Sequence, residues 1–174
     1  MPIVFIFFVW PAYGNGRDCA PGLISFLMGE KLKKVSIYTE SITVKLDTGL
    51  DIADVTGDLK RVIQNSEIKV GSLAATIVGS TGSITTIEYE PGVVDDLKEA
   101  INRISPPGIY YAHEEAWHDG NGHSHVQAAL LGPSISLPVR ESRLALGTWQ
   151  QVVVINHDNR PRQRAVEVTI LGSL

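Results

Sequence analysis

Alternating apolar and polar positions, which are typical of half-buried β-strands, recur along most of the chain. The segment from Val35 to Leu46 alternates throughout and is rich in β-branched residues, so we expect a strand with one buried face. Further strand-like runs are EIKVGSLAATIVG, SITTIEYE, SISLPV and RLALG. The runs WQQVVVIN and RAVEVTILG flank the polar sequence HDNRPR, and we interpret them as a hairpin.

Other segments show apolar residues at helical spacing instead. In VTGDLKRVIQNS this spacing occurs at Leu59, Val62 and Ile63, and Thr56 or Asp58 is available as an N-cap. We therefore expect a helix here.

The clearest helix begins at Pro91, a residue that the first turn of a helix accepts readily. The sequence PPG ends it after residue 105. Its apolar stripe consists of Val94, Leu97, Ile101 and Ile104.

The segment HSHVQAALLGPS fits either a strand or a helix, and we favour a short helix. Val126 and Leu130 have helical spacing, Gly132 with the following proline would stop the helix, and Asn121 or Ser124 could cap its start.

This mixture predicts an α+β fold: a single compact domain over residues 34–174, mostly antiparallel β-sheet with two to four helices. Residues 1–33 form an N-terminal extension in this interpretation. Their apolar run is shorter than the roughly 20 residues of a membrane-spanning helix, and it lacks the basic region of a signal peptide. Because MGEKLKK resembles a cytosolic start, Met28 is a candidate start residue; the alternative is that PIVFIFFVW is an extra strand.

Composition excludes some classes of partner. The net charge is −4 and no basic tract stands out, so we expect no nucleic-acid partner and, without a spanning segment, no membrane partner. Cys19 is the single cysteine and cannot form an internal disulfide.

One short segment, YYAHEEAWHDGNGHSH, holds four of the five histidines. They are His113, His118, His123 and His125, with Glu114, Glu115, Asp119 and Asn121 among them. A metal site, an acid/base site and a solvated loop are the candidates. On a strand, His123 and His125 would share one face, but on a helix they point in different directions, and His113 could then converge with one of them.

Glu88, Gln150 and three arginines are further candidates. Glu88 is either a general base or metal ligand, or a charge on a solvent face. Arg160, Arg162 and Arg164 would share one side of an extended chain and bind phosphate through forked donors, or they are exposed cations of a hairpin tip. Gln150 is a candidate hydrogen-bond donor at a pocket.

Two neighbouring features carry less weight. Trp149 is a candidate core residue. Residues 79–83, GSTGS, lack both the glycine pattern and the lysine of phosphate-binding loops, so we interpret them as a turn.

Several motifs occur in one order: GSTGSITTIEYEPG, YYAHEEAWHDGNGHSHVQAALLG, SISLPV, RLALGTWQQVVVI and DNRPRQRAVEVTILG. Together they resemble the YjbQ family, also called the UPF0047 or secondary thiamine-phosphate synthase family, over about residues 34–174. The resemblance implies a compact α+β domain and a cytoplasmic homotrimer with polar residues in a cleft near the subunit boundary. It also implies a weak thiamine-phosphate synthase activity, which joins a pyrimidinylmethyl pyrophosphate to a thiazole phosphate and releases pyrophosphate.

The resemblance implies catalytic roles for four residues. His113 matches the Tyr-x-His element, Asn121 and His125 match the Asn-x-x-x-His element, and Glu88 matches the acid that ends a strand motif.

The substrate-binding residues that the resemblance implies are Gln150, from Gly-Thr-Trp-Gln, and Arg160 and Arg162, from the basic-proline hairpin. The chain departs from the common pattern at Gly79, where the family has a histidine, while His123 is an additional one. We therefore expect an active centre that differs from the common pattern.

The expected function is a thiamine-phosphate synthase-type transferase acting on a small phosphorylated metabolite. His113, His123 and His125 would act as acids and bases or bind a divalent metal such as zinc. The alternatives are a metal- or small-ligand-binding trimer and a metal-dependent phosphoester hydrolase.

Overall fold

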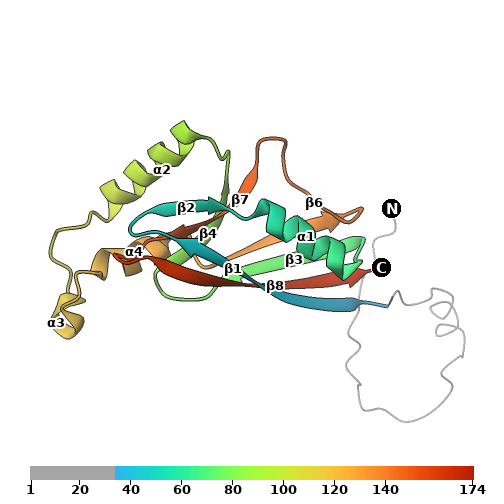
Figure 1. Ribbon diagram of the computed structural model, residues 1–174, viewed down its shortest axis with the longest axis horizontal. Helices are drawn as coiled ribbons and strands as arrows, with labels where there is room; N and C mark the ends of the chain where they lie inside the picture. Colours follow the sequence, from blue (N-terminus) through green and yellow to red (C-terminus); the bar gives the residue numbers. More distant parts are fainter. Residues whose placement is uncertain (1–33) are drawn as a thin grey trace, which may run out of the picture. The chain divides into compact units, whose positions relative to one another are not determined.

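The computed structural model describes residues 34–174, which fold into two antiparallel sheets and four helices (Figure 1). One sheet has the strand order β1-β8-β3-β5-β6, and the other has the order β2-β7-β4. The strands are β1 (Ser36–Leu46), β2 (Asp51–Asp54), β3 (Val70–Ile77), β4 (Gly82–Ile87), β5 (Ser134–Arg140), β6 (Arg143–Leu144), β7 (Gln151–Asn156) and β8 (Arg162–Ser173). The helices are α1 (Thr56–Ser66), α2 (Pro91–Ile104), α3 (Glu114–Trp117) and α4 (Gly122–Leu131).

The α+β fold with antiparallel strands is therefore confirmed. No helix within residues 34–174 is long and apolar enough to cross a membrane. The expectations for residues 1–33 concern a segment outside the described range.

The expected hairpin of the last two strands is wrong, because β7 and β8 lie in different sheets. β7 pairs with β2 and β4, and β8 pairs with β1 and β3. Every residue of β7 after the first is buried, since both faces of the strand are covered. Val152 and Val154 join the larger core, whereas Val153 and Ile155 join a smaller core. A continuous apolar run is typical of such a strand.

Helix α2 packs on the smaller core, which also contains Ile52 of β2 and Val153 and Ile155 of β7. Ile101 is buried, and Val94 and Leu97 are half-buried against Val153 and Ile155. Ile104 does not follow the prediction: it is 70% exposed, because the apolar stripe extends past the residues that contact the sheet.

The expected N-cap of α1 is wrong. Val55 occupies the cap position, and Thr56 is the first helical residue. The hydroxyl of Thr56 instead accepts a hydrogen bond from the backbone N–H of Val152 at 2.8 Å, which ties α1 to β7. The short helix α4 is confirmed, with Asn121 at the cap position and Gly132 at its C-terminal end.

Candidate functional site

A cavity of about 460 Å³ lies where three connecting segments meet: the β3–β4 turn, residues 113–125, and the β7–β8 turn. Its lining residues are Gly79, Ser80, Thr81, His113, Trp117, Asp119, Asn121, His125, Asp158, Arg162 and Arg164. Five candidate residues predicted from the sequence therefore share one cavity: His113, Asn121, His125, Arg162 and Arg164.

His113 and His125 converge across this cavity. Their ring centroids are 4.5 Å apart, with an interplanar angle of 40°. His113 precedes α3 and His125 lies in the first turn of α4. The close approach depends on Gly122, because a Cβ there would lie 2.5 Å from Cβ of Tyr111 and 3.2 Å from Cβ of His113. The starts of α3 and α4 can approach each other this closely only because residue 122 has no side chain.

The Nε2 atom of His113 is buried and has no hydrogen-bond partner within the described residues. The closest acid is Asp119, whose Oδ1 lies 3.6 Å away, beyond hydrogen-bond length. Glu114 does not enter the cavity: its carboxylate accepts bonds from the N–H groups of Gly120 and Gly122, at 2.8 and 3.3 Å. Glu114 thereby fixes the turn that places Asp119 and Asn121.

His123 lies apart from the other two predicted metal ligands. Its ring is tilted against Tyr111, with centroids 6.3 Å apart, and its Nε2 is 3.3 Å from Oγ of Ser124. Burial lowers the pKa of His123 from its ordinary value. In residues 34–174 no three His, Cys, Asp or Glu side chains are arranged to hold a metal ion. The structure thus brings together the pair His113 and His125, but not the set of three.

Asp158 organises the cationic side of the cavity. Its Oδ2 accepts hydrogen bonds from Nε of Arg162 at 2.8 Å and from Oγ1 of Thr81 at 2.9 Å, and Nη2 of Arg164 is 3.8 Å away. Burial opposes its charge, but the bonds from Arg162 and Thr81 outweigh burial and hold the pKa of Asp158 below its ordinary value.

The three arginines were expected either to share one side of an extended chain or to be exposed cations of a hairpin tip, and the structure separates them. Arg162 and Arg164 belong to β8, so both reach Asp158 and the cavity. Arg160 precedes the strand, is exposed, and does not line this cavity. Its backbone N–H donates to Asp158 Oδ1 at 3.1 Å. The signal that identifies Arg164 is the alternate spacing in NRPRQR, because only strand positions keep alternate side chains on one face.

Asn121 lines the cavity, and its side-chain oxygen accepts a hydrogen bond from within the protein. Its Oδ1 accepts a 3.2 Å hydrogen bond from the backbone N–H of Asn159, and the residue is 5% exposed. This bond joins the start of α4 to the β7–β8 turn.

His157 is a buried histidine beside the cavity that the sequence did not indicate as a candidate. Its Nε2 lies 2.7 Å from Oγ of Ser83, and its Nδ1 lies 3.2 Å from Oε1 of Gln127. Because Oε1 can only accept, Nδ1 carries the ring proton and Nε2 accepts from Ser83. Burial, followed by the charge of Arg164, lowers the pKa of His157 to about 4. The group is 1% exposed, so it supports the cavity wall rather than contacting a ligand.

Glu88 and Gln150 lie away from this cavity. Glu88 is exposed one residue after β4, whereas the cavity adjoins the start of that strand, roughly 20 Å away at the usual rise per residue. Gln150 donates to Oγ1 of Thr86 at 3.0 Å and accepts from the N–H of Gly147 at 3.1 Å. Trp149 is 70% exposed, so its assignment to the core is wrong.

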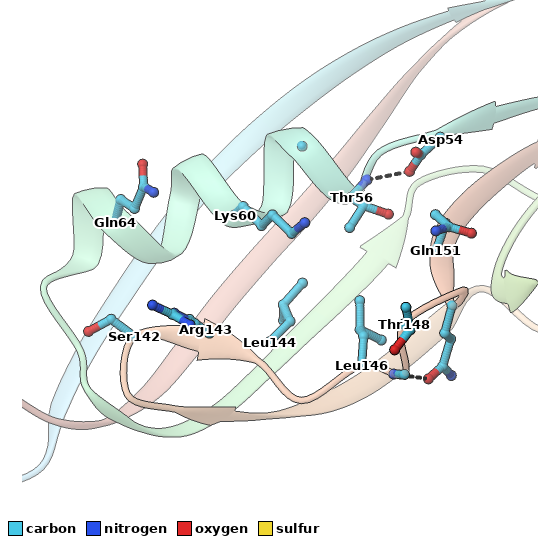
Figure 2. Close-up of a pocket in the computed structure, with 13 residues that line it drawn as sticks. Asp54, Thr56, Lys60, Gln64, Ser142, Arg143, Leu144, Leu146, Thr148 and Gln151 are labelled. Atoms are coloured by element: carbon cyan, nitrogen blue, oxygen red, sulfur yellow. Dashed lines mark hydrogen bonds between the residues drawn. The ribbon is translucent and has the colours of Figure 1, made fainter. Parts of the chain in front are cut away.

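Gln150 lines a second cavity, of about 710 Å³, between α1 and the segment from β6 to β7 (Figure 2). Lys60 and Gln64 of α1 face this cavity from one side, and Arg143 and Leu144 face it from the other. The histidine segment and the Gly-Thr-Trp-Gln element therefore line different cavities of one chain. His113 and His125 line the smaller cavity, and Gln150 lines the larger one.

Comparisons with known proteins agree with this fold. A family model described as "UPF0047 protein YjbQ-like" matches residues 40–173. A UPF0047 protein from Archaeoglobus fulgidus is 32% identical over 130 residues, which cover 75% of this chain and 98% of that protein. A UPF0047 protein from Methanothermobacter thermautotrophicus is 29% identical over 138 residues, covering 79% of this chain and 94% of that protein.

Solved structures give the same result. A YbjQ-like protein of unknown function from Sulfolobus solfataricus superposes with a TM-score of 0.76 at 29% identity, covering 80% of this chain and 100% of that one. A hypothetical protein from Aeropyrum pernix superposes with a TM-score of 0.73 at 32% identity, covering 78% and 99%.

Proposed function

The chain belongs to the UPF0047 family of YjbQ-like proteins, and from this premise we propose that the cavity with His113 and His125 is an active site. Its substrate is a small phosphorylated metabolite, and its chemistry is acid/base-assisted group transfer. The observation that supports this proposal is the meeting of two imidazoles and the guanidinium of Arg162 in one cavity.

The two kinds of side chain supply complementary chemistry. Imidazole is the side chain best suited to move protons near neutral pH. Guanidinium binds phosphate oxygens through forked donors and neutralises the charge that a leaving phosphate gains. Arg162 is the cation suited to this task, because its side chain is 44% exposed while its Nε is held by Asp158.

The specific reaction that we propose is of the thiamine-phosphate synthase type. The C–O bond between a pyrimidinylmethyl carbon and pyrophosphate breaks, and a C–N bond forms to the ring nitrogen of a thiazole phosphate. Arg162 would neutralise the departing pyrophosphate, and His113 or His125 would give it a proton. Positioning of both substrates supplies the rest of the rate enhancement. Glu88 and Gln150 take no part in this mechanism, because they lie away from the cavity.

The test is an assay of purified protein with both half-substrates, measuring thiamine phosphate and released pyrophosphate. We expect His125→Gln to lower the rate by roughly 100-fold, the usual contribution of a general acid or base. The control is His118→Gln, because His118 is exposed and does not line the cavity. Equal rates in the two variants would reject the catalytic role of His125, and no product from wild type would reject the reaction.

A second candidate is a metal-dependent phosphoester hydrolase, which is favoured because the buried Nε2 of His113 has no hydrogen-bond partner among the described residues. The imidazoles of His113 and His125 would hold a divalent metal such as zinc, and the metal would supply an activated water molecule. Metal analysis beside phosphate release from a panel of phosphoesters tests it. One metal per chain, lost in His125→Ala together with hydrolysis, is the expected result; metal-free protein with unchanged activity contradicts it.

The proposal also includes a cytoplasmic location and assembly into a homotrimer, which the family resemblance supports. Fractionation of cells that express the protein tests the location, and recovery with membranes would contradict it.

A further inference from the structure

Within residues 34–174, three consecutive backbone N–H groups of the β3–β4 turn at the cavity have no hydrogen-bond partner. The N–H groups of Gly79, Ser80 and Thr81 make no hydrogen bond to another residue of the described range, whereas the N–H of Val78 donates to Ala165 O at 2.9 Å. Gly79 has a φ of +123°, a conformation that L side chains rarely adopt. Successive free N–H groups in such a turn form a concavity that binds anions.

A buried guanidinium lies against the same turn. The side chain of Arg164 is 7% exposed, and its Nη2 donates to the carbonyl and hydroxyl oxygens of Thr81 and to Oδ1 of Asn156. Its Nε has no partner within residues 34–174. A Cβ at position 79 would lie 2.8 Å from Nη1, and one at Gly82 would lie 3.5 Å from Nε. Glycine at position 79 therefore makes room for the guanidinium.

The charge on this side of the cavity is not balanced. Arg162 and Arg164 share the single carboxylate of Asp158, and the other acid of the lining, Asp119, faces His113 instead. The side chain of Arg164 is largely removed from solvent, and this burial lowers its pKa from the ordinary value. The group of two arginines and one aspartate has one more positive than negative charge. An anionic ligand stabilises such a buried cation.

We propose that the turn Gly79–Thr81 and the guanidinium of Arg164 bind a phosphoryl group of the substrate. The proposal rests on the proposed function for its place in the active site and extends it to a defined phosphate subsite. The backbone N–H groups contact the phosphoryl oxygens from one side, and Arg164 compensates the charge from the other. The cation comes from β8, so the turn needs no lysine of its own.

Isothermal titration of the full chain with inorganic phosphate, and separately with pyrophosphate, tests this subsite without any turnover. We expect wild type to bind both, and Arg164→Gln to weaken binding at least about tenfold, because the positive charge that compensates the phosphoryl group is lost. The matched control is Arg140→Gln, which removes the same charge from an exposed residue of β5. Pyrophosphate binding tighter than phosphate would identify a diphosphate as the natural group; equal binding would identify a monoester.

A second pair of variants covers the case in which Arg164→Gln does not fold. Gly79→Ala strains the backbone and displaces Nη1 of Arg164, so it should also weaken phosphate binding. Gly108→Ala is its control, since Gly108 has a φ of +81° but nothing within 4 Å of an added Cβ. Circular dichroism shows whether each variant is folded.

No phosphate binding by wild type overturns the proposal, as does unchanged binding in folded Arg164→Gln and Gly79→Ala. Phosphate binding that depends on Arg164 and Gly79, without any transferase activity, supports the subsite and contradicts the proposed reaction. Transferase activity that neither variant changes supports the proposed reaction and contradicts the subsite.

Discussion

The chain's five histidines show how strongly the surroundings of a residue decide its task. His113 and His125 face each other in a cavity, His118 is exposed, and His123 and His157 are held in polar networks. His157 is the most buried of them, and its two ring nitrogens are both engaged. We therefore assign His157 a structural role as a neutral imidazole.

The stability of the fold should decrease in acid because of His157. Its pKa in the folded state is about 4, below the ordinary 6.5, so the unfolded chain binds the proton first as the pH falls. Between about pH 6.5 and pH 4 this difference removes up to about 3 kcal/mol from the free energy of unfolding. Urea unfolding of wild type and His157→Gln at pH 7 and pH 4.5 measures it, and we expect a shallower pH dependence in the variant. His118→Gln should keep the wild-type dependence; parallel curves for His157→Gln and wild type would contradict the assignment.

The sequence could predict only part of the site at this scale. The spacing of residue types indicated His113, His125 and Arg162, because each lies in a distinctive local run. Thr81 and Asp158 belong to turns that approach each other only when β4 pairs with β7, at Gly82 and Asn156. Local sequence carries no signal for such a contact between distant segments.

At the scale of elements, helix starts position both the core and the site. Glu90 caps α2, since its carboxylate accepts hydrogen bonds from the N–H groups of Gly92 at 2.9 Å and Val93 at 2.5 Å. We expect Glu90→Ala to lower the free energy of unfolding by about 1 kcal/mol, the usual loss for a cap. Urea denaturation measures this value. Glu99→Ala, an exposed change in the same helix, should have a smaller effect; the reverse order would show that the cap is unimportant.

The start of α4 should be sensitive to a single methyl group. Gly122→Ala places a Cβ within 3.2 Å of both Tyr111 and His113 Cβ atoms, so α4 must move away from His113 and the imidazole pair must separate. We expect a loss of about 1–3 kcal/mol in unfolding free energy, together with loss of activity. Gly57→Ala in α1 is the matched control, because nothing lies within 4 Å of an added Cβ there. Normal stability in Gly122→Ala, measured by thermal unfolding, would contradict the packing argument.

Periodicity predicted the type of most elements, yet it did not predict which sheet each strand joins. β7 is the clearest case: its apolar run shows that both faces are covered, and this fits a middle strand of either sheet. The hairpin interpretation failed because the HDNRPR segment carries the chain from one sheet to the other.

At the scale of the whole molecule, the described domain leaves apolar side chains uncovered. Val126 and Leu130 of α4 are four residues apart on one face of the helix, and they are 41% and 60% exposed. Exposed apolar patches commonly mark interfaces. This face of α4 is therefore our candidate for the contact within the proposed homotrimer.

Light scattering coupled to gel filtration tests the assembly. We expect wild type to have three times the chain mass and Leu130→Glu to shift toward the mass of one chain, because a buried charge opposes association. Gln64→Glu introduces the same charge on an exposed position of α1 and should remain trimeric. A wild type with the mass of one chain contradicts the trimer, and a trimeric Leu130→Glu assigns the contact to another face.

Strand β8 lies between β1 and β3 and pairs with both, yet β1 is the first described strand in chain order and β8 is the last. No shorter stretch of the described chain can assemble the larger sheet, since β8, which joins β1 to β3, would be missing. Folding therefore has to close a loop from residue 46 to residue 162 before β1 gains its partner. Such long-range pairing slows folding to times on the order of milliseconds to seconds. During that time β1 and β3 expose unpaired edges, and the choice between folding and aggregation depends on how quickly β8 arrives.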